Sequence, residues 1–81
     1  MEEQIRTLLE KEVTEAGYIL DKVKLEKEGS TLFLRLEIDK EGIIDVEDCV
    51  KVTNIVNPIL DEADPIEENY ILDVSSKERG V

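Results

Sequence analysis

The feature that most constrains the fold of this chain is a strict alternation of apolar and polar side chains near its middle. Large apolar residues occupy every second position: Leu32, Leu34, Leu36 and Ile38 alternate with Phe33, Arg35, Glu37 and Asp39. Successive side chains of a β-strand point to opposite faces, so this period of two indicates a strand with one buried face. Such a strand needs a sheet around it and a second layer to cover its apolar side.

Two further segments have the same period. In residues 18–26 the apolar side chains Ile19, Val23 and Leu25 alternate with Lys22, Lys24 and Glu26. The turn signal Glu28-Gly29-Ser30 separates this segment from the next, which predicts an antiparallel hairpin. Residues 69–76 form the third segment, with one face made of Tyr70, Leu72 and Val74.

Two segments have the period of a helix. Residues 2–16 place apolar side chains on one face (Ile5, Leu8, Leu9, Val13 and Ala16), and Gly17 is expected to stop this helix. A second helix is expected to begin after Asp45, its N-cap, with a stripe made of Val46, Cys49, Val50, Thr53, Val56 and Leu60, widened by Val52, Ile55 and Ile59. Pro58 predicts a kink or an early end of that helix, and residues 61–68, which hold five acids, are expected to form a loop.

The element order is therefore α-β-β-α-β, and 81 residues suffice for one domain. It predicts an α/β (α+β) two-layer sandwich: a three-stranded mixed sheet with both helices on one face. A right-handed crossover through the second helix returns the third strand parallel to the second. The pattern leaves open whether the third strand lies beside the first strand or the second.

Composition excludes several functions. Asp and Glu number 21 against 10 Lys and Arg, a net charge of −11, which argues against direct binding of DNA or RNA. The chain has no His and one Cys, so a His-based triad and a disulfide framework are excluded within it, and Cys49 is expected to be a small core residue. The longest uncharged run covers residues 52–60, too short to span a membrane, and the Met1-Glu2-Glu3 start is not that of a signal peptide. We expect a cytoplasmic protein with no metal or other cofactor.

The acids are unevenly distributed. Residues 1–36 hold eight acids and six bases, whereas residues 37–73 hold twelve acids against Lys40 and Lys51. We therefore expect one strongly negative end, built from the turn before the second helix and the loop at residues 61–68. Such a surface gives solubility, and it also attracts cationic partners.

A calcium-binding loop is the one motif that composition suggests. Acids stand at positions 1, 3, 5, 9 and 12 of a twelve-residue loop (Glu37, Asp39, Glu41, Asp45 and Asp48), with Gly42 at position 6 and Ile44 at position 8. The residues before it alternate with period two, however, where an EF-hand needs an entering helix. We favour a strand-to-helix turn with an N-cap over a calcium site.

The chain resembles the N-terminal domain of the bacterial ribosome maturation factor RimP. Four pieces in order carry the resemblance: Leu34-Arg35-Leu36-Glu37-Ile38-Asp39-Lys40, Asp45-Val46-Glu47-Asp48-Cys49, Asp64-Pro65-Ile66 and Val74-Ser75-Ser76. It covers about residues 5–76 and implies a non-enzymatic factor that binds the small ribosomal subunit during its assembly. It also implies that a second, Sm-like domain follows. Family members continue with Pro-Gly and then Arg-Pro-Leu, whereas this chain has Lys77-Glu78-Arg79-Gly80-Val81. We therefore assign residues 1–76 to the domain and residues 77–81 to a tail where the Sm-like domain is expected to begin but is absent.

Together these observations predict a monomeric, non-catalytic domain that docks on the small ribosomal subunit or a basic ribosomal protein through an acidic face. The contact residues that we predict are Asp61, Glu62, Asp64, Glu67 and Glu68. The alternatives are an acidic protein–protein module unrelated to ribosomes, for example a dimer formed through an exposed sheet edge, and a calcium-responsive domain.

Overall fold

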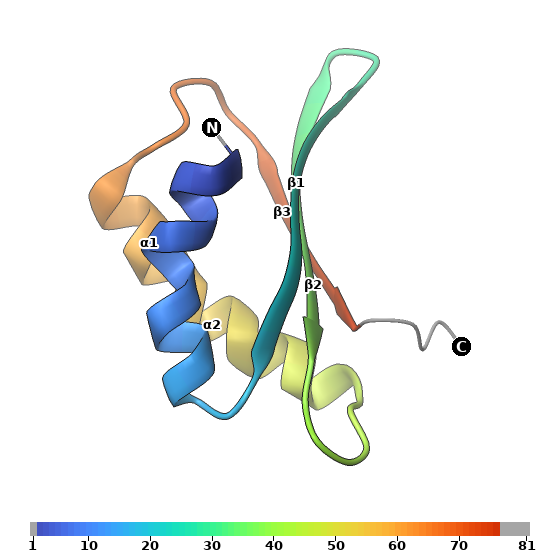
Figure 1. Cartoon of the computed structure of the whole chain (residues 1–81). Coiled ribbons are helices and arrows are strands. Elements are labelled where there is room, and N and C mark those ends of the chain that lie inside the picture. The colour runs from blue at the N-terminus through green and yellow to red at the C-terminus, as the bar shows by residue number, and fades with distance from the viewer. Residues whose placement is uncertain (1, 77–81) are drawn as a thin grey trace.

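The computed structural model describes residues 2–76 and has the predicted order of elements (Figure 1). The elements are α1 (Glu2–Glu15), β1 (Ile19–Glu28), β2 (Thr31–Asp39), α2 (Val46–Ala63) and β3 (Ile71–Ser76). The tail assigned to residues 77–81 lies outside the described residues.

The three strands form one mixed sheet. β1 pairs antiparallel with β2, and β3 pairs parallel with β2, in the spatial order β1-β2-β3. Figure 1 shows both helices on the same side of this sheet. The predicted two-layer α+β fold and the parallel return of the third strand are confirmed. The question that the sequence left open is also answered: β3 lies beside β2, so β1 and β3 are the two edge strands.

The core lies between the sheet and the two helices. Each layer contributes fully buried aliphatic side chains: Ile5, Leu9 and Val13 from α1, Leu34, Leu36 and Ile38 from β2, and Val52 and Val56 from α2. The alternation that predicted β2 is thus the alternation between its buried and its open face.

β1 departs from the expected alternation because it contains a bulge. The register with β2 shifts between Leu20 and Lys22, so Leu20 and Val23 are both buried although they are three residues apart. Ile19, expected on the buried face, is 55% exposed. Arg6 of α1 donates hydrogen bonds to the carbonyls of Leu20 (2.8 Å) and Asp21 (2.7 Å), which stabilises the bulge.

α1 ends one residue earlier than predicted, at Glu15, and Ala16 is exposed. Gly17 stops the helix as expected: it has φ +97°, and its N–H bonds the carbonyl of Thr14 at 3.0 Å. The N–H of Tyr18 bonds the carbonyl of Val13 at 3.1 Å, which completes a Schellman motif and turns the chain towards β1.

α2 continues through Pro58 to Ala63, so the predicted early end is wrong. Pro58 has no N–H, so the carbonyl of Asn54 lacks its helical hydrogen-bond donor. Both residues are exposed, so water can bond that carbonyl instead. The acidic loop therefore begins at Asp64, which caps the helix with φ 49°.

The buried stripe of α2 also differs from the expected one. Its centre is Asp48, Val52, Val56 and Leu60, whereas Val46 and Val50 point to solvent and are 74% and 55% exposed. Apolar side chains on two sides of the helix made the sequence pattern ambiguous.

Candidate functional site

Four of the five predicted contact residues surround one hollow at the C-terminal end of α2. This hollow, which we call the acidic hollow, has a volume of about 430 Å³ and is lined by Asn57, Asp61, Asp64, Ile66, Glu67, Glu68, Asn69, Tyr70 and Leu72. The residues come from the last turns of α2, the loop after it and the start of β3. Glu62, the fifth predicted residue, is exposed on α2 but does not line the hollow.

The position of these carboxylates opposes the electrostatics of the helix. The C-terminal end of a helix carries partial negative charge and favours Lys or Arg, yet the last turn of α2 contains no base. Glu68 forms an ion pair with Lys27 of β1 at 3.1 Å, between side chains that are both more than half exposed. Among residues 2–76, the side chains of Asp61, Glu62, Asp64 and Glu67 have neither an ion pair nor a hydrogen bond. The fold of the described residues is therefore not held by any hydrogen bond or ion pair of these four carboxylates.

Tyr70 and Leu72 give the acidic hollow an apolar side. Tyr70 is partly buried, and burial, with the nearby charges of Asp61 and Asp64, raises the pKa of its phenol. A neutral aromatic ring beside unpaired carboxylates suits a Lys or Arg side chain, whose stem packs on apolar surface while its charge meets the acids. Sequence reasoning assigned these two residues only to the core. The sequence held one indication of their role, because Asn69-Tyr70 directly follows the run of acids.

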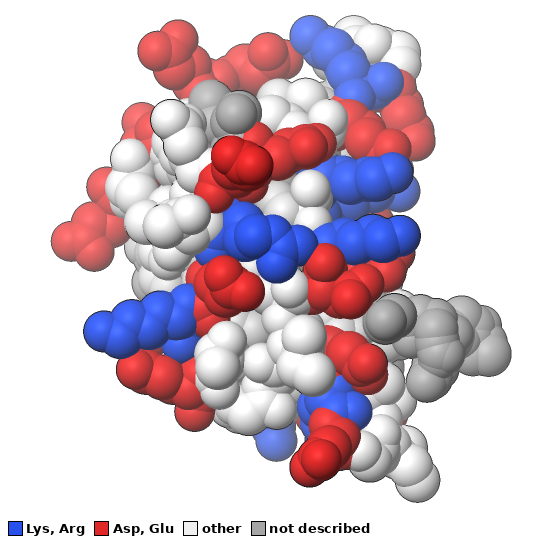
Figure 2. All heavy atoms as spheres, viewed as in Figure 1, with Lys and Arg blue, Asp and Glu red and all other residues white. Residues whose placement is uncertain are grey.

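The acidic half of the sequence does not form one end of the molecule, contrary to our expectation. α2 has 18 residues and separates the turn before it from the loop after it by about 27 Å, at 1.5 Å per residue. Figure 1 shows these two segments at opposite ends of the molecule, and Figure 2 shows acidic side chains at both ends of the view. The two acidic segments lie in the same half of the sequence, but α2 joins them and its length holds them apart.

At the other end, Asp45 and Asp48 organise the start of α2. The Asp45 carboxylate accepts hydrogen bonds from the N–H groups of Glu47 (3.0 Å) and Asp48 (3.3 Å). The Asp48 carboxylate accepts one from the N–H of Asp45 (2.9 Å), which completes a capping box. The predicted N-cap is confirmed.

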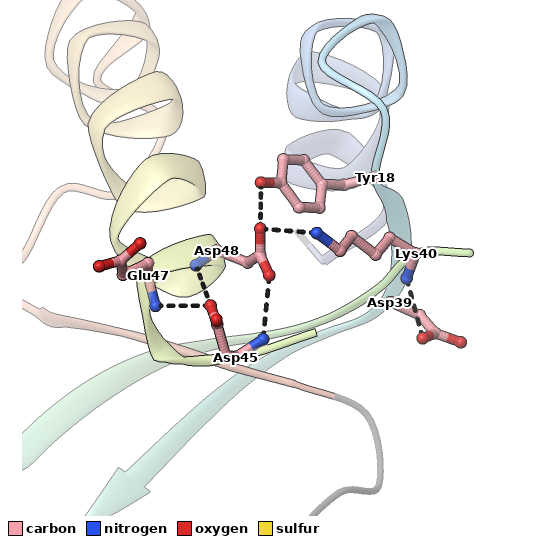
Figure 3. A network of polar contacts seen from close by, with 6 residues as sticks. All are labelled: Tyr18, Asp39, Lys40, Asp45, Glu47 and Asp48. Carbon is pink, nitrogen blue, oxygen red and sulfur yellow. Dashed lines mark hydrogen bonds and ion pairs between the residues drawn. The ribbon is translucent and has the colours of Figure 1, made fainter. Parts of the chain in front are cut away.

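Asp48 also joins three separate parts of the chain (Figure 3). It is 5% exposed, and its carboxylate accepts hydrogen bonds from the Tyr18 hydroxyl at 2.7 Å and the Lys40 ammonium at 3.1 Å. The hydrogen bond from Tyr18, with those from Asp45 and Lys40, lowers the pKa of Asp48 well below its usual range. The same bond, together with burial, raises the pKa of Tyr18 to about 12. Tyr18, Lys40 and Asp45 all bond Asp48, so this network holds parts of the fold together.

Sequence reasoning placed Asp48 in the first turn of α2 and missed its burial. The spacing of Asp45 and Asp48 was a usable signal, because an acid three residues after the N-cap completes a capping box. Glu37 and Asp39 belong to β2, so the favoured strand-to-helix turn is confirmed and the chain lacks the entering helix of an EF-hand. Within residues 2–76, no group of three or more Asp, Glu, Cys or His side chains is arranged to hold a metal ion.

Cys49 packs against the core, as predicted, but it is only partly buried. Burial raises the pKa of its thiol, with the charges of Asp48 and Asp45 adding to the effect. A raised pKa keeps the thiol protonated near neutral pH and disfavours its use as a nucleophile.

Arg35 lies on the open face of the sheet and is surrounded by acids. Arg35 lies within ion-pair distance of Glu26 (3.2 Å), Glu28 (3.2 Å) and Asp73 (3.7 Å), and its guanidinium is 4.6 Å from the centre of the Phe33 ring. The guanidinium of Arg35 is thus already paired within the fold.

The chain matches the model of a known protein family. The model of the RimP N-terminal domain family matches residues 8–77, which is most of the chain. Separately, none of the helices in the described part of the chain is both long enough and apolar enough to cross a bilayer.

Proposed function

Because this chain belongs to the family of RimP N-terminal domains, a family of ribosome maturation factors, we propose that it is a non-catalytic docking domain for the maturing small ribosomal subunit. Its partner is a basic component of that subunit, and the contact is made at the acidic hollow. Asp61, Asp64, Glu67 and Glu68 act there, with Glu62 on the adjacent turn of α2.

One observation carries the proposal. Asp61, Glu62 and Asp64 lie at the negative end of the α2 dipole, and Glu67 lines the acidic hollow. None of these four acids has a cation partner among the described residues. Carboxylates in this arrangement repel one another and the helix end, so folding alone gives no reason for them. A cationic side chain from a partner removes that repulsion, which favours association and steers it from a distance.

The test compares two variants of equal charge in co-sedimentation with immature small subunits at low and moderate salt. The first variant neutralises the four unpaired carboxylates: Asp61→Asn, Glu62→Gln, Asp64→Asn and Glu67→Gln. It leaves the ion pair between Glu68 and Lys27 intact. The matched control neutralises four exposed acids of α1: Glu3→Gln, Glu10→Gln, Glu12→Gln and Glu15→Gln.

We expect the first variant to bind at least about tenfold more weakly at low salt and to lose most of its salt dependence, while the control keeps both. Both variants should remain folded, because exposed acids contribute little to stability. Equal binding by the two variants, or no binding by the unmodified protein, contradicts the proposal.

A further inference from the structure

The two edge strands of the sheet are protected very differently. α1 covers the free edge of β1: Glu2 accepts a hydrogen bond from the N–H of Leu25 at 2.8 Å, and Arg6 bonds the carbonyls of Leu20 and Asp21. The bulge in β1 further disrupts that edge. β1 is therefore closed to additional strands.

β3 has no such protection. All six of its residues align with β2, and its other edge pairs with no strand among residues 2–76. Alternate residues of a strand turn their N–H and C=O groups to opposite edges, so about half of the β3 backbone groups face outwards. In the described part of the chain, no side chain bonds these groups. β3 is therefore open to another strand.

The boundary between β3 and α2 has a hollow at each end. The acidic hollow joins Asn57 and Asp61 of α2 to Tyr70 and Leu72 at the start of β3. The second hollow, which we call the apolar hollow, has a volume of about 460 Å³ and joins the start of α2 to the end of β3. It is lined by Ile44, Asp45, Val46, Cys49, Val74, Ser75 and Ser76.

The apolar hollow exposes more aliphatic surface than the fold requires. Ile44 and Cys49 flank the N-cap at the positions of a hydrophobic staple, and both pack against the core. Val46 is 74% exposed, and Val50, one turn further on the same side of α2, is 55% exposed. Adjacent exposed aliphatic side chains are typical of a contact surface.

We propose that β3 accepts an extended segment of a protein partner as a fourth strand, with an aliphatic side chain in the apolar hollow and a Lys or Arg side chain in the acidic hollow. The identity of the partner as a basic protein rests on the proposed function, whereas strand addition rests on the free edge and the two hollows. The hollows meet β3 about four residues apart, or roughly 13 Å at 3.3 Å per residue. The aliphatic and basic residues of the partner are therefore four positions apart and point to the same side.

The direction of the added strand is antiparallel to β3, the slightly more stable pairing. β3 runs from the acidic hollow to the apolar one, so the aliphatic residue precedes the basic residue in the partner. A second copy of this chain does not fit, because its β3, Ile-Leu-Asp-Val-Ser-Ser, offers no base and carries Asp73.

The probe is a nine-residue Thr/Ser peptide with Ile at position 3 and Arg at position 7, titrated into the full chain at low salt and followed by backbone NMR. Two further peptides carry N-methyl groups on the odd or on the even residues, which removes the donors of one edge at a time. We expect chemical shift changes and slowed amide exchange in residues 71–76. One methylated peptide should bind about tenfold or more weakly while the other keeps its affinity. Equal affinity for the two methylated peptides, or shifts confined to β1, overturns the proposal.

Variants then test the two hollows. Val46→Ser should weaken binding of the probe peptide but not of an analogue with Ala in place of Ile. The double variant Asp61→Asn and Asp64→Asn should weaken binding of the probe peptide but not of an analogue with Gln in place of Arg. Val46 and both acids are exposed, so these variants should fold, and Glu12→Gln on α1 is the matched control. If a variant binds the probe peptide and its analogue with equally reduced affinity, the assignment of Ile to the apolar hollow or of Arg to the acidic hollow is wrong.

The two proposals fail separately. If subunit binding depends on the four acids but the methylated peptides do not differ, docking stands and strand addition is wrong. If the peptides add to β3 but subunit binding ignores the acids, strand addition stands and the proposed function is wrong. A dimer seen by sedimentation equilibrium, with amide exchange in residues 71–76 that slows as the dimer forms, assigns that edge to a second copy and overturns the inference.

Discussion

Replacing Arg6 by Met is expected to destabilise the fold by about 1.5–3 kcal/mol. The guanidinium donates two hydrogen bonds, at 2.8 and 2.7 Å, to the carbonyls of Leu20 and Asp21 at the β1 bulge. A hydrogen bond to a charged group contributes about 1.5–3 kcal/mol when water is excluded. The Arg6 side chain is 34% exposed, so water can partly replace it, and roughly half of the summed value remains. Met keeps most of the apolar stem, so the loss comes mainly from the guanidinium.

The assay is urea denaturation with a thermal melt. For a domain of this size about 1 kcal/mol corresponds to roughly 4–8 °C, so the melting temperature should fall by about 6–24 °C. Arg6→Lys keeps the charge but loses the planar fork, and it should recover only a small part of the stability. Glu10→Gln removes the ion pair at 3.7 Å between Arg6 and Glu10 and should cost less than about 0.5 kcal/mol.

The result that refutes this reasoning is a cost for Arg6→Met no larger than that of Glu10→Gln. Such a result would mean that water satisfies the bulge carbonyls as well as Arg6 does. Full recovery by Arg6→Lys would show that charge alone, and not the paired geometry of the guanidinium, supports the bulge.

Three further predictions test the interior and the turns. Leu36→Ala, at a fully buried position of β2, should cost about 3–4 kcal/mol in urea denaturation, whereas Val50→Ala, at a position of α2 that is 55% exposed, should cost less than about 0.5 kcal/mol; similar costs would contradict the burial of Leu36 and the exposure of Val50. Gly17→Ala should cost about 1–2 kcal/mol through its φ of +97° alone, because an added Cβ meets no atom within 4 Å; a neutral result would mean that the turn changes its conformation. The hydrogen bond to Asp48 and burial raise the pKa of Tyr18 from 10.0 to about 12. The folded protein therefore holds this proton more tightly than the unfolded chain does. The resulting stability is complete below pH 10 and disappears between about pH 10 and 12. Ultraviolet titration of tyrosinate should show this late phase, and Tyr18→Phe should abolish both the phase and the loss of stability; a late phase that persists in the variant belongs to Tyr70.

Where one local signal decided the structure, the sequence was sufficient. The alternation of Leu32, Leu34, Leu36 and Ile38 predicted β2 and its buried face, because the period of a strand depends only on backbone geometry. Asp45 predicted the start of α2 in the same way, through bonds to N–H groups two and three residues ahead. The family resemblance extended through several such pieces and is confirmed by the match to residues 8–77.

Residues that respond to distant parts of the chain were predicted poorly. Pro58 did not end α2, because it lies on the exposed side and the buried side of the helix packs on the sheet. The bulge at Asp21 was not visible in the sequence, because it depends on pairing with β2 and on Arg6 from another element. Asp48 became buried because Tyr18, 30 residues away, supplies its hydrogen-bond donor.

The candidate site divides in the same manner. The sequence alone determined which residues carry the acidic charge, because charge is a property of each side chain. Only the tertiary structure decided where the charge lies: the length of α2 moved one set of acids to each end, and β3 brought Tyr70 and Leu72 beside one of them. The free edge of β3 likewise follows from the strand order, since an edge exists only once the sheet is assembled.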